Sequence, residues 1–290
     1  TFGDLIRVPG SAWNQPGSKH HPLPTAGHNS LKEAMADGAK VAIVYSTMDA
    51  LNLARDHPDE QVVFLGIGFE TTAPTVAAAV ITAARMGLAN FSVLSAHKLL
   101  PPAMNALLSS GDLKIDGFLC PGHVTTIIGT SAYQVVALKF GTPCVVTGFE
   151  PVDILQGVLM LVDLIQSDRR EVAIQYQRGA ASEGNPKARE VMNEVFEPVD
   201  APWRGLGIIP KSGLGLREKY QDWDARRRFD LEVPVAVEPP GCRCGDVLRG
   251  LLIPPDCALF RRACNPDQPI GPCMVSSEGT CAAYFKYGEE

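Results

Sequence analysis

The first 241 residues contain almost no cysteine. Only Cys120 and Cys144 occur there, and the other six of the eight cysteines fall in the last 49 residues. The N-terminus, TFGDLIRVPG, lacks the charged-then-apolar layout of a secretory signal, so nothing in it directs the chain to an oxidising compartment. In a reduced, cytoplasmic setting, clustered cysteines are more often metal ligands or redox thiols than disulfides.

Long apolar runs and excess basic charge are also missing. The most apolar stretch, 152–165, is interrupted by Asp153 and Asp163, and no run reaches the 18 or more residues of a membrane-spanning helix. The net charge of -6 argues against a nucleic-acid partner, because phosphate binding requires a basic face. We therefore expect neither membrane nor nucleic acid as a partner. The 290 residues, 46% of them hydrophobic, can bury a core of more than one domain.

Short apolar runs alternate with helix-like segments from residue 41 to residue 148. Such alternation predicts an α/β fold in which parallel strands are flanked by helices on both faces. We expect strands at 41–45, 62–66, 91–95, 117–120 and 144–148, and helices at 47–57, 72–87, 101–111 and 130–141. Further helices are expected at 152–165 and 187–196, whereas 203–240 has no clear period.

Three regions follow from these patterns. Residues 1–150 read as the α/β part, 151–240 as a helical and mixed segment that completes the α/β subdomains, and 241–290 as a cysteine-rich lobe. The last region contains five prolines after Cys242, which exclude long regular helices or strands. Residues 12–29 read as an irregular loop whose three histidines are more typical of a surface loop than of a metal site.

Polar side chains follow several of the expected strands. These strand-end residues are Glu70, His97, His123 and Glu150. Ligands of open α/β sheets gather at the carboxyl ends of strands, so the four could converge on one cleft. Such a histidine is more often structural than catalytic, but convergence of several in one cleft would reverse that preference.

The turn GFETTAP follows the second strand. Thr71 or Thr72 can cap the next helix, and Pro74 suits its first turn. Glu70 fits two interpretations equally well: a carboxylate that caps a helix, or an anion that meets a cation or a partner's donors.

The late cysteines favour a metal site without fixing its ligands. No C-x2-C pair is present, which weakens a zinc-finger interpretation, whereas an iron-sulfur cluster accepts longer spacings. Spacing alone therefore places iron-sulfur only slightly ahead of zinc and leaves the ligating cysteines undecided.

Several ordered motifs together resemble the HypD family of hydrogenase maturation factors, over essentially the whole chain. They are GFETTAP at 68–74, PGHVTTIIG at 121–129, GFEPVDILQGVLMLV at 148–162, WRGLGIIP at 203–210 and GPCMVSSEGTCAAY at 271–284. The resemblance implies a [4Fe-4S] cluster held by cysteines spaced C-x12-C-x6-C-x16-C. That spacing is found here at Cys244, Cys257, Cys264 and Cys281, while Cys242 and Cys273 are left over.

The resemblance also implies an accessory role rather than that of an ordinary enzyme. Members of this family act as scaffolds and electron-transfer proteins in making the Fe(CN)2CO unit of [NiFe]-hydrogenases, with HypC and HypE as partners. By resemblance, Glu70, Thr71 and Thr72 of the first turn and His123 of the PGHV turn line the cleft or the surface where the partners dock.

The sequence departs from the family at its beginning. The family's C-G-x-H-x-H and G-P-G-C-P-V-C motifs, which supply an iron-anchoring thiol and a redox pair, do not occur in these 290 residues. We therefore expect the chain to be a fragment of a longer protein. Two rival interpretations stay open: an α/β small-molecule enzyme using Glu70, His97 and His123 with a structural zinc in its tail, and an interaction module with free thiols.

Overall fold

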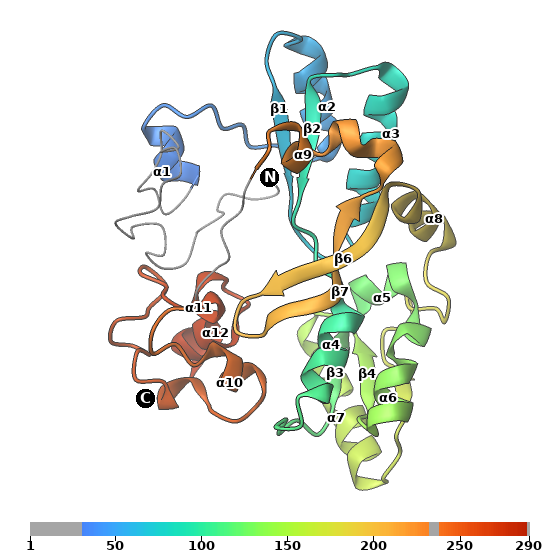
Figure 1. Cartoon of the computed structure of the whole chain (residues 1–290). Helices are drawn as coiled ribbons and strands as arrows, with labels where there is room; N and C mark the ends of the chain where they lie inside the picture. The colour runs from blue at the N-terminus through green and yellow to red at the C-terminus, as the bar shows by residue number, and fades with distance from the viewer. Residues whose placement is uncertain (1–30, 232–237, 289–290) are drawn as a thin grey trace.

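The computed structural model describes residues 31–231 and 238–288 of the chain. It contains two α/β units, a long hairpin and a C-terminal lobe (Figure 1). The histidines of loop 12–29 lie outside the described residues. The first helix, α1 (Leu31–Ala36), precedes the first α/β unit.

The first α/β unit is built on two parallel strands. β1 (Val62–Gly66) pairs with β2 (Phe91–Ser95) so that Val62 lies opposite Phe91. Two helices, α2 (Thr47–Asp56) and α3 (Ala73–Met86), precede and follow β1 in the chain, and their alanine-rich faces are buried against the sheet. Distant segments complete the unit: α8 (Pro186–Val195), the 3-10 helix η3 (Glu218–Trp223) and α9 (Ala225–Arg228).

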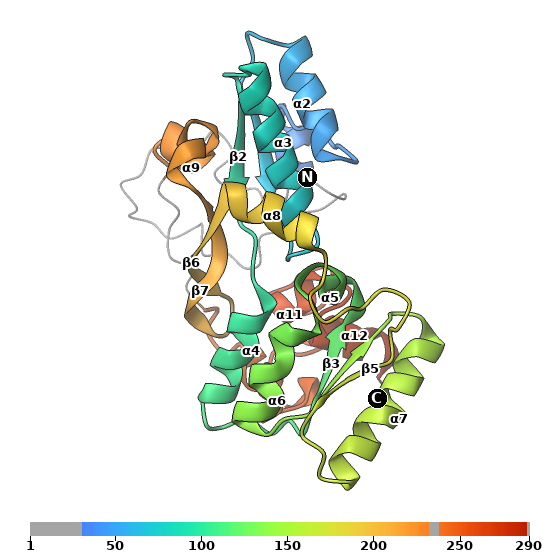
Figure 2. The same cartoon turned by 90° about the vertical axis from the view of Figure 1, so that its right-hand side faces the viewer.

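The second α/β unit has a parallel sheet in the order β3-β4-β5. Its strands are β3 (Phe118–Pro121), β4 (Cys144–Thr147) and β5 (Val172–Ile174). Helix α7 (Pro151–Gln166) lies on one face, and α4 (Leu100–Ser109) and α6 (Gln134–Phe140) lie on the other (Figure 2). The shorter α5 (Gly122–Ile128) and the 3-10 helix η2 (Thr130–Tyr133) connect β3 to α6. The α/β class expected from the alternating pattern is confirmed.

An antiparallel hairpin connects the first unit to the C-terminal lobe. β6 (Phe196–Trp203) and β7 (Gly207–Leu216) pair from Phe196 and Leu216 at the base to Trp203 and Gly207 near the turn. The base is part of the core of the first unit, and at the turn Gly205 lies against Gly245 of the lobe. Figure 1 shows the hairpin reaching across to the lobe.

The C-terminal lobe (residues 238–288) contains only short elements. They are α10 (Cys244–Leu248), the 3-10 helix η4 (Pro254–Asp256), α11 (Pro272–Val275) and α12 (Thr280–Tyr287). Its core consists largely of cysteine and aromatic side chains, including Phe260, Met274 and four buried cysteines. The prolines therefore limit the regular structure of this lobe as expected.

Local sequence explains several helix boundaries. Ser46 and Asp49 form a capping box at the start of α2, in which each side chain accepts a hydrogen bond from the other residue's backbone N–H. Pro74 lies in the first turn of α3 as expected, and Gly87 ends that helix in the left-handed conformation with φ 65°. Thr72 occupies the N-cap position of α3, but its hydroxyl donates backwards to the Phe69 carbonyl instead of capping the helix.

Two expectations about secondary structure were wrong. Residues 41–45 are not a strand, and they pair with none of the strands in residues 31–231 and 238–288. A strand needs the backbone hydrogen bonds of a pairing strand, and this apolar run has no such partner for its N–H and C=O groups. The helix expected at 130–141 is divided, because its first turn is the 3-10 helix η2.

The hairpin was missed because its strands contain proline. Pro198, Pro202 and Pro210 lie within β6 and β7 and weaken the sequence signal for a strand. Pro210 lies where the pairing of the two strands is irregular, between Ile209 and Gly213, so it takes the place of no paired residue. The turn itself has the expected chemistry, since Gly205 and Gly207 adopt positive φ angles of 79° and 75°.

Candidate metal centre and strand-end site

Three short helices of the C-terminal lobe bring buried thiols together. Cys244 begins α10, Cys273 lies in α11 and Cys281 lies in the first turn of α12. Their sulfur atoms all lie within 4.8 Å of one another, and all three residues are buried. This spacing suits several thiolates that share one metal centre.

Two further cysteines of the expected ligand set border the same space. Cys257 and Cys264 line a cavity of about 20 Å³ together with Cys242, Cys244 and Cys281. The rest of its wall is mostly apolar, with Leu259, Phe260 and Met274 among the lining residues. Of the four cysteines expected as ligands, Cys244 and Cys281 therefore belong to the close group, while Cys257 and Cys264 face the same cavity.

Hydrogen bonds between neighbouring thiols shift the pKa values of the cysteines in this group. Hydrogen bonds from the Cys244 and Cys273 thiols lower the pKa of Cys281 to about 4, whereas the same network raises the pKa of Cys273. No disulfide is formed by any of the eight cysteines. A metal ligand must be a thiolate, and the pKa values of Cys244 and Cys281 are both lowered by hydrogen bonds from neighbouring thiols.

A glycine allows the sulfurs to approach on one side. A Cβ atom on Gly271 would lie 2.6 Å from the Cys242 sulfur and 2.7 Å from the Cys244 sulfur. Any side chain there would therefore displace these thiols. The donor set is soft, buried and confined, so the lobe can hold a metal.

Glu70 lies inside the protein rather than on its surface. Its exposed fraction is 1%, and its Oε1 accepts a hydrogen bond from the Leu100 backbone N–H at 2.9 Å. Burial raises the pKa of this carboxyl, against the effect of its backbone hydrogen bonds. Thr71 and Thr72, its neighbours, are half-buried.

His97 is also buried, close to the end of β1. Its Nδ1 lies 3.0 Å from the Ser95 hydroxyl, and its ring packs against Phe196 with centroids 5.6 Å apart. Burial lowers the pKa of His97 to about 4, so the ring is neutral at neutral pH. Gly66 makes room for it, because a Cβ atom there would lie 2.9 Å from the imidazole.

His123, in contrast, is exposed in the first turn of α5. Its ring meets Phe149 edge-on with centroids 4.6 Å apart. Partial burial lowers the pKa of His123, and the negative charge of Glu278 from the C-terminal lobe acts in the opposite direction. The PGHV turn therefore lies close enough to the lobe to respond to its charge.

The strand-end residues do not share one solvent-filled cleft. Glu70 and His97 are enclosed within the protein, whereas His123 and Glu150 are exposed on the second unit. Glu150 is the N-cap residue of α7, and its carboxylate lies 3.8 Å from Arg178.

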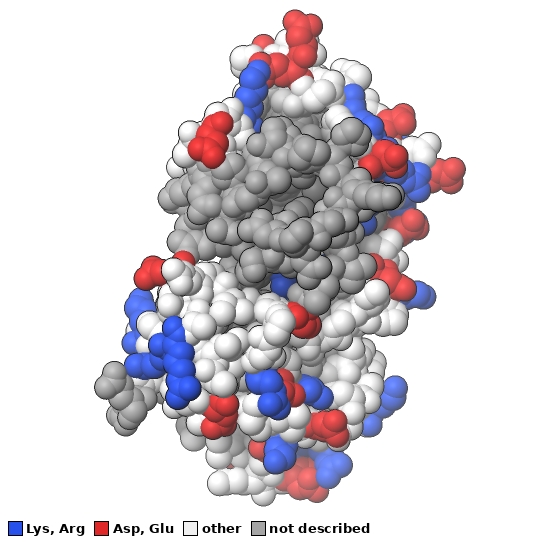
Figure 3. Space-filling view, turned by 60° about the vertical axis from the view of Figure 1, so that its left-hand side comes forward, with Lys and Arg blue, Asp and Glu red and all other residues white. Residues whose placement is uncertain are grey.

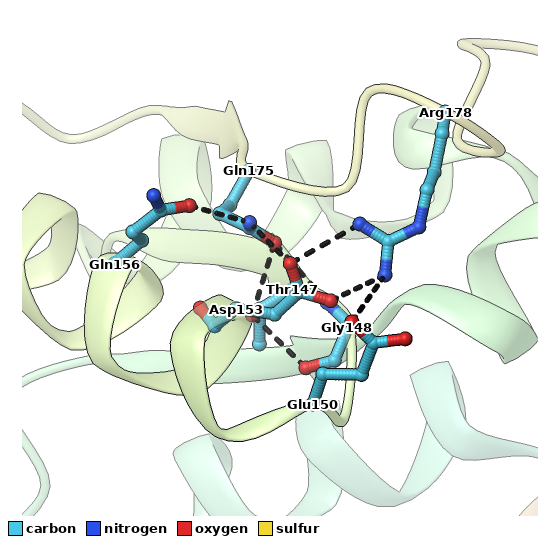
Figure 4. A network of polar contacts seen from close by, with 7 residues as sticks. All are labelled: Thr147, Gly148, Glu150, Asp153, Gln156, Gln175 and Arg178. Atoms are coloured by element: carbon cyan, nitrogen blue, oxygen red, sulfur yellow. Dashed lines mark hydrogen bonds and ion pairs between the residues drawn. The ribbon is translucent and has the colours of Figure 1, made fainter.

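Sequence reasoning missed a polar network at the end of β4. Asp153, buried in the first turn of α7, pairs with Arg178 and accepts a hydrogen bond of 2.8 Å from the Gln175 amide (Figure 4). These contacts lower the pKa of Asp153, with Arg178 as the main cause. The motif GFEPVD contains the aspartate, but its partners lie more than 20 residues further along the chain, so no local signal marks the pair.

Thr147 and Gly148 complete this network. The Thr147 hydroxyl donates to the Asp153 carbonyl at 2.8 Å, and the Gly148 N–H donates to the Gln175 side chain at 3.2 Å. A Cβ atom on Gly148 would collide with the Asp153 carboxylate. The network therefore fixes the turn between β4 and α7.

The described surface carries charges of both signs. Basic and acidic side chains are interspersed over the described part of the face in Figure 3. None of the helices within residues 31–231 and 238–288 is long and apolar enough to cross a membrane.

Comparison with known proteins agrees with these features. The family model described as "HypD: Hydrogenase formation hypA family" matches residues 1–288. The hydrogenase maturation factor HypD of Azotobacter vinelandii is 45% identical over 296 residues, which cover 100% of this chain and 74% of the relative. HypD of Cupriavidus necator is 43% identical over 295 residues, covering 99% and 74%, and a hydrogenase expression/formation protein of Methanocaldococcus jannaschii is 41% identical over 287 residues, covering 99% and 75%.

The match extends over both α/β units, the hairpin and the cysteine-rich lobe, and it is far above the identity needed to establish common ancestry. The chain therefore belongs to the HypD family of hydrogenase maturation factors.

Proposed function

We propose that this chain is an iron-sulfur scaffold that serves the assembly of the Fe(CN)2CO unit of [NiFe]-hydrogenases. In this proposal Cys244, Cys257, Cys264 and Cys281 hold a [4Fe-4S] cluster, and the iron that receives cyanide and carbon monoxide is cargo rather than a resident cofactor. The observation that carries the proposal is the meeting of thiols from across the C-terminal lobe around one apolar cavity. Its role is accessory and redox-active, and the eight free cysteines are consistent with work in the cytoplasm.

The chemistry of the residues supports this role. A bound cluster would supply electrons, and the apolar wall around the sulfurs would keep water from it. The lowered pKa of Cys281 favours its thiolate, and Gly271 leaves space for the sulfurs of Cys242 and Cys244. The lobe also lies near His123, through Glu278, so its metal centre and the PGHV turn are neighbours in this proposal.

The ligand assignment has a direct test. Iron and acid-labile sulfide are measured on anaerobically purified protein, with visible and paramagnetic-resonance spectra, for the unaltered chain, Cys257→Ala and Cys273→Ala. We expect about four iron and four sulfide per chain in the unaltered protein and in Cys273→Ala, and loss of the cluster in Cys257→Ala.

Other outcomes would redirect the proposal. A cluster retained in Cys257→Ala but lost in Cys273→Ala would replace Cys257 by Cys273 in the ligand set, in keeping with the close group of three sulfurs. Zinc in place of iron would support the rival in which a structural zinc stabilises the tail of an α/β enzyme.

HypC and HypE are the proposed partners, docking near the turns that carry Thr71, Thr72 and His123. These residues are exposed or half-buried, as a docking surface requires. We expect His123→Ala to weaken binding of HypC or HypE by about tenfold, as loss of one contact residue often does. Binding is measured by titration calorimetry; unchanged binding of both partners, with unchanged iron content, would remove His123 from the docking surface.

A further inference from the structure

Helix α4 begins without a capping side chain of its own. Its N-cap residue is Leu99, whose side chain offers no acceptor, and its first turn contains Pro101 and Pro102. Proline has no backbone N–H, so Leu100 and Ala103 supply the donors of that turn. The start of α4 therefore depends on an acceptor from elsewhere in the protein.

Glu70 supplies that acceptor from the other α/β unit. It lies between β1 and α3 in the first unit, whereas α4 packs with α6 in the second unit. Its Oε1 accepts the Leu100 N–H at 2.9 Å, and the positive end of the α4 dipole favours the carboxylate there. One buried side chain thus joins the two units.

The segment that connects the units is held on both sides at the same place. Lys98 N–H donates to the Gly68 carbonyl at 2.9 Å, and Leu99 N–H donates to the Ser212 carbonyl of β7 at 2.8 Å. The next N–H along the chain, that of Leu100 in the first turn of α4, donates to Glu70. The connector is therefore fixed to the GFETT turn and to the hairpin before the second unit begins.

Glu70 is too deeply buried to contact the iron or a partner protein at the surface. Its exposed fraction is 1%, while Phe69 beside it is 42% exposed. Its second oxygen, Oε2, is buried without a hydrogen-bond partner. The side chain points into the junction between the units rather than toward the surface of the turn.

We propose that Glu70 is a positioning residue, which caps α4 across the unit boundary and so fixes the second α/β unit, with its PGHV turn, relative to the first. Only the maturation arm of the test below rests on the proposed function. The hydrogen-exchange arm depends on the structure alone.

The test compares Glu70→Ala with Glu70→Gln, using Glu60→Gln as an exposed control. Hydrogen exchange is measured residue by residue over 96–104, where the two prolines leave few amides to resolve. We expect Glu70→Ala to speed exchange of the Leu100 amide by at least about tenfold, because its acceptor is lost. Glu70→Gln keeps an acceptor oxygen and should stay within about threefold of the unaltered protein, as should the control.

The second arm measures hydrogenase activity in cells that lack their own HypD and express each variant. Retained maturation in Glu70→Gln, with loss in Glu70→Ala, supports a positioning role. Loss in Glu70→Gln while Leu100 stays protected would overturn it, since the carboxylate would then act chemically. Unchanged Leu100 exchange in Glu70→Ala would overturn it as well, and if that variant does not fold, Glu70→Gln still decides between the two roles. Failure of the unaltered chain to support maturation would count against the proposed function of these 290 residues acting on their own, and it would leave the exchange result standing.

Discussion

The two α/β units and the C-terminal lobe are stabilised in different ways. The units have parallel strands and helices of up to 16 residues, and their cores contain mainly aliphatic and aromatic side chains. The lobe has α-helices of only four to eight residues, and cysteines make up four of the seven buried residues of its core. The units can therefore fold by burying apolar surface, whereas the lobe, with its smaller apolar core, would gain stability from a metal held by its sulfurs.

Removing a thiol from the lobe should have the largest effect. Cys281 belongs both to the close group of sulfurs and to the expected ligand set, so Cys281→Ser should lose the metal and unfold the lobe. Hydrogen exchange should rise across 242–288 while β1 to β5 stay protected. The exposed Ser277→Ala is the matched control in the same lobe. A lobe that stays protected without metal would show that its apolar contacts suffice.

A cavity in the first unit should lower the stability of that unit and leave the metal content of the lobe unchanged. Phe91 is fully buried in the core around β2, so Phe91→Ala should cost about 3–5 kcal/mol of unfolding free energy. Denaturant unfolding measures the loss, and the metal content of the folded protein should be unchanged. Loss of metal together with stability would mean that the lobe and the first unit fold as one cooperative body.

The smallest expected effect depends on pH. His97 has a pKa of about 4 when folded and about 6.5 when unfolded, so the unfolded chain binds the extra proton between these values. The contribution of the neutral His97 ring to the free energy of unfolding is therefore fully present above pH 6.5, and it is lost as the pH falls toward 4. We expect about 2 kcal/mol less stability at pH 5 than at pH 7 from this residue.

The histidine effect is checked by denaturant unfolding of the unaltered protein and of His97→Gln at both pH values. The variant lacks the titrating ring, so its loss of stability on acidification should be smaller by that amount. An equal loss in both proteins would show that His97 is not buried in its neutral form.

Much of the fold could be predicted from the sequence. The runs at 62–66, 91–95 and 144–148 form strands because each is short, apolar and followed by a turn, and the apolar stretch at 152–165 forms α7. The hairpin could not be predicted, because its stability comes from pairing along its length rather than from a local apolar pattern. Residues 41–45 show the opposite failure: their apolar pattern predicted a strand, but no other strand pairs with them.

The candidate site divides in the same way. Cysteine content and spacing pointed to the lobe that can hold a metal, because clustered cysteines in a reduced setting are more often metal ligands or redox thiols than disulfides. The inclusion of Cys273 in the close group of sulfurs was decided by how α10, α11 and α12 pack. Likewise, the sequence left Glu70 either as a carboxylate that caps a helix or as an anion that meets a cation or a partner's donors, and only the structure placed it at the start of α4.

The sequence by itself thus determined the α/β class, the family and the position of the cysteine lobe, because apolar period, turn residues and thiol content are local properties of the chain. The tertiary structure decided which sulfurs meet, which carboxylates are enclosed and how Asp153 finds Arg178. Those contacts join residues far apart in the chain, and their distances depend on how whole units pack together, which no local pattern encodes.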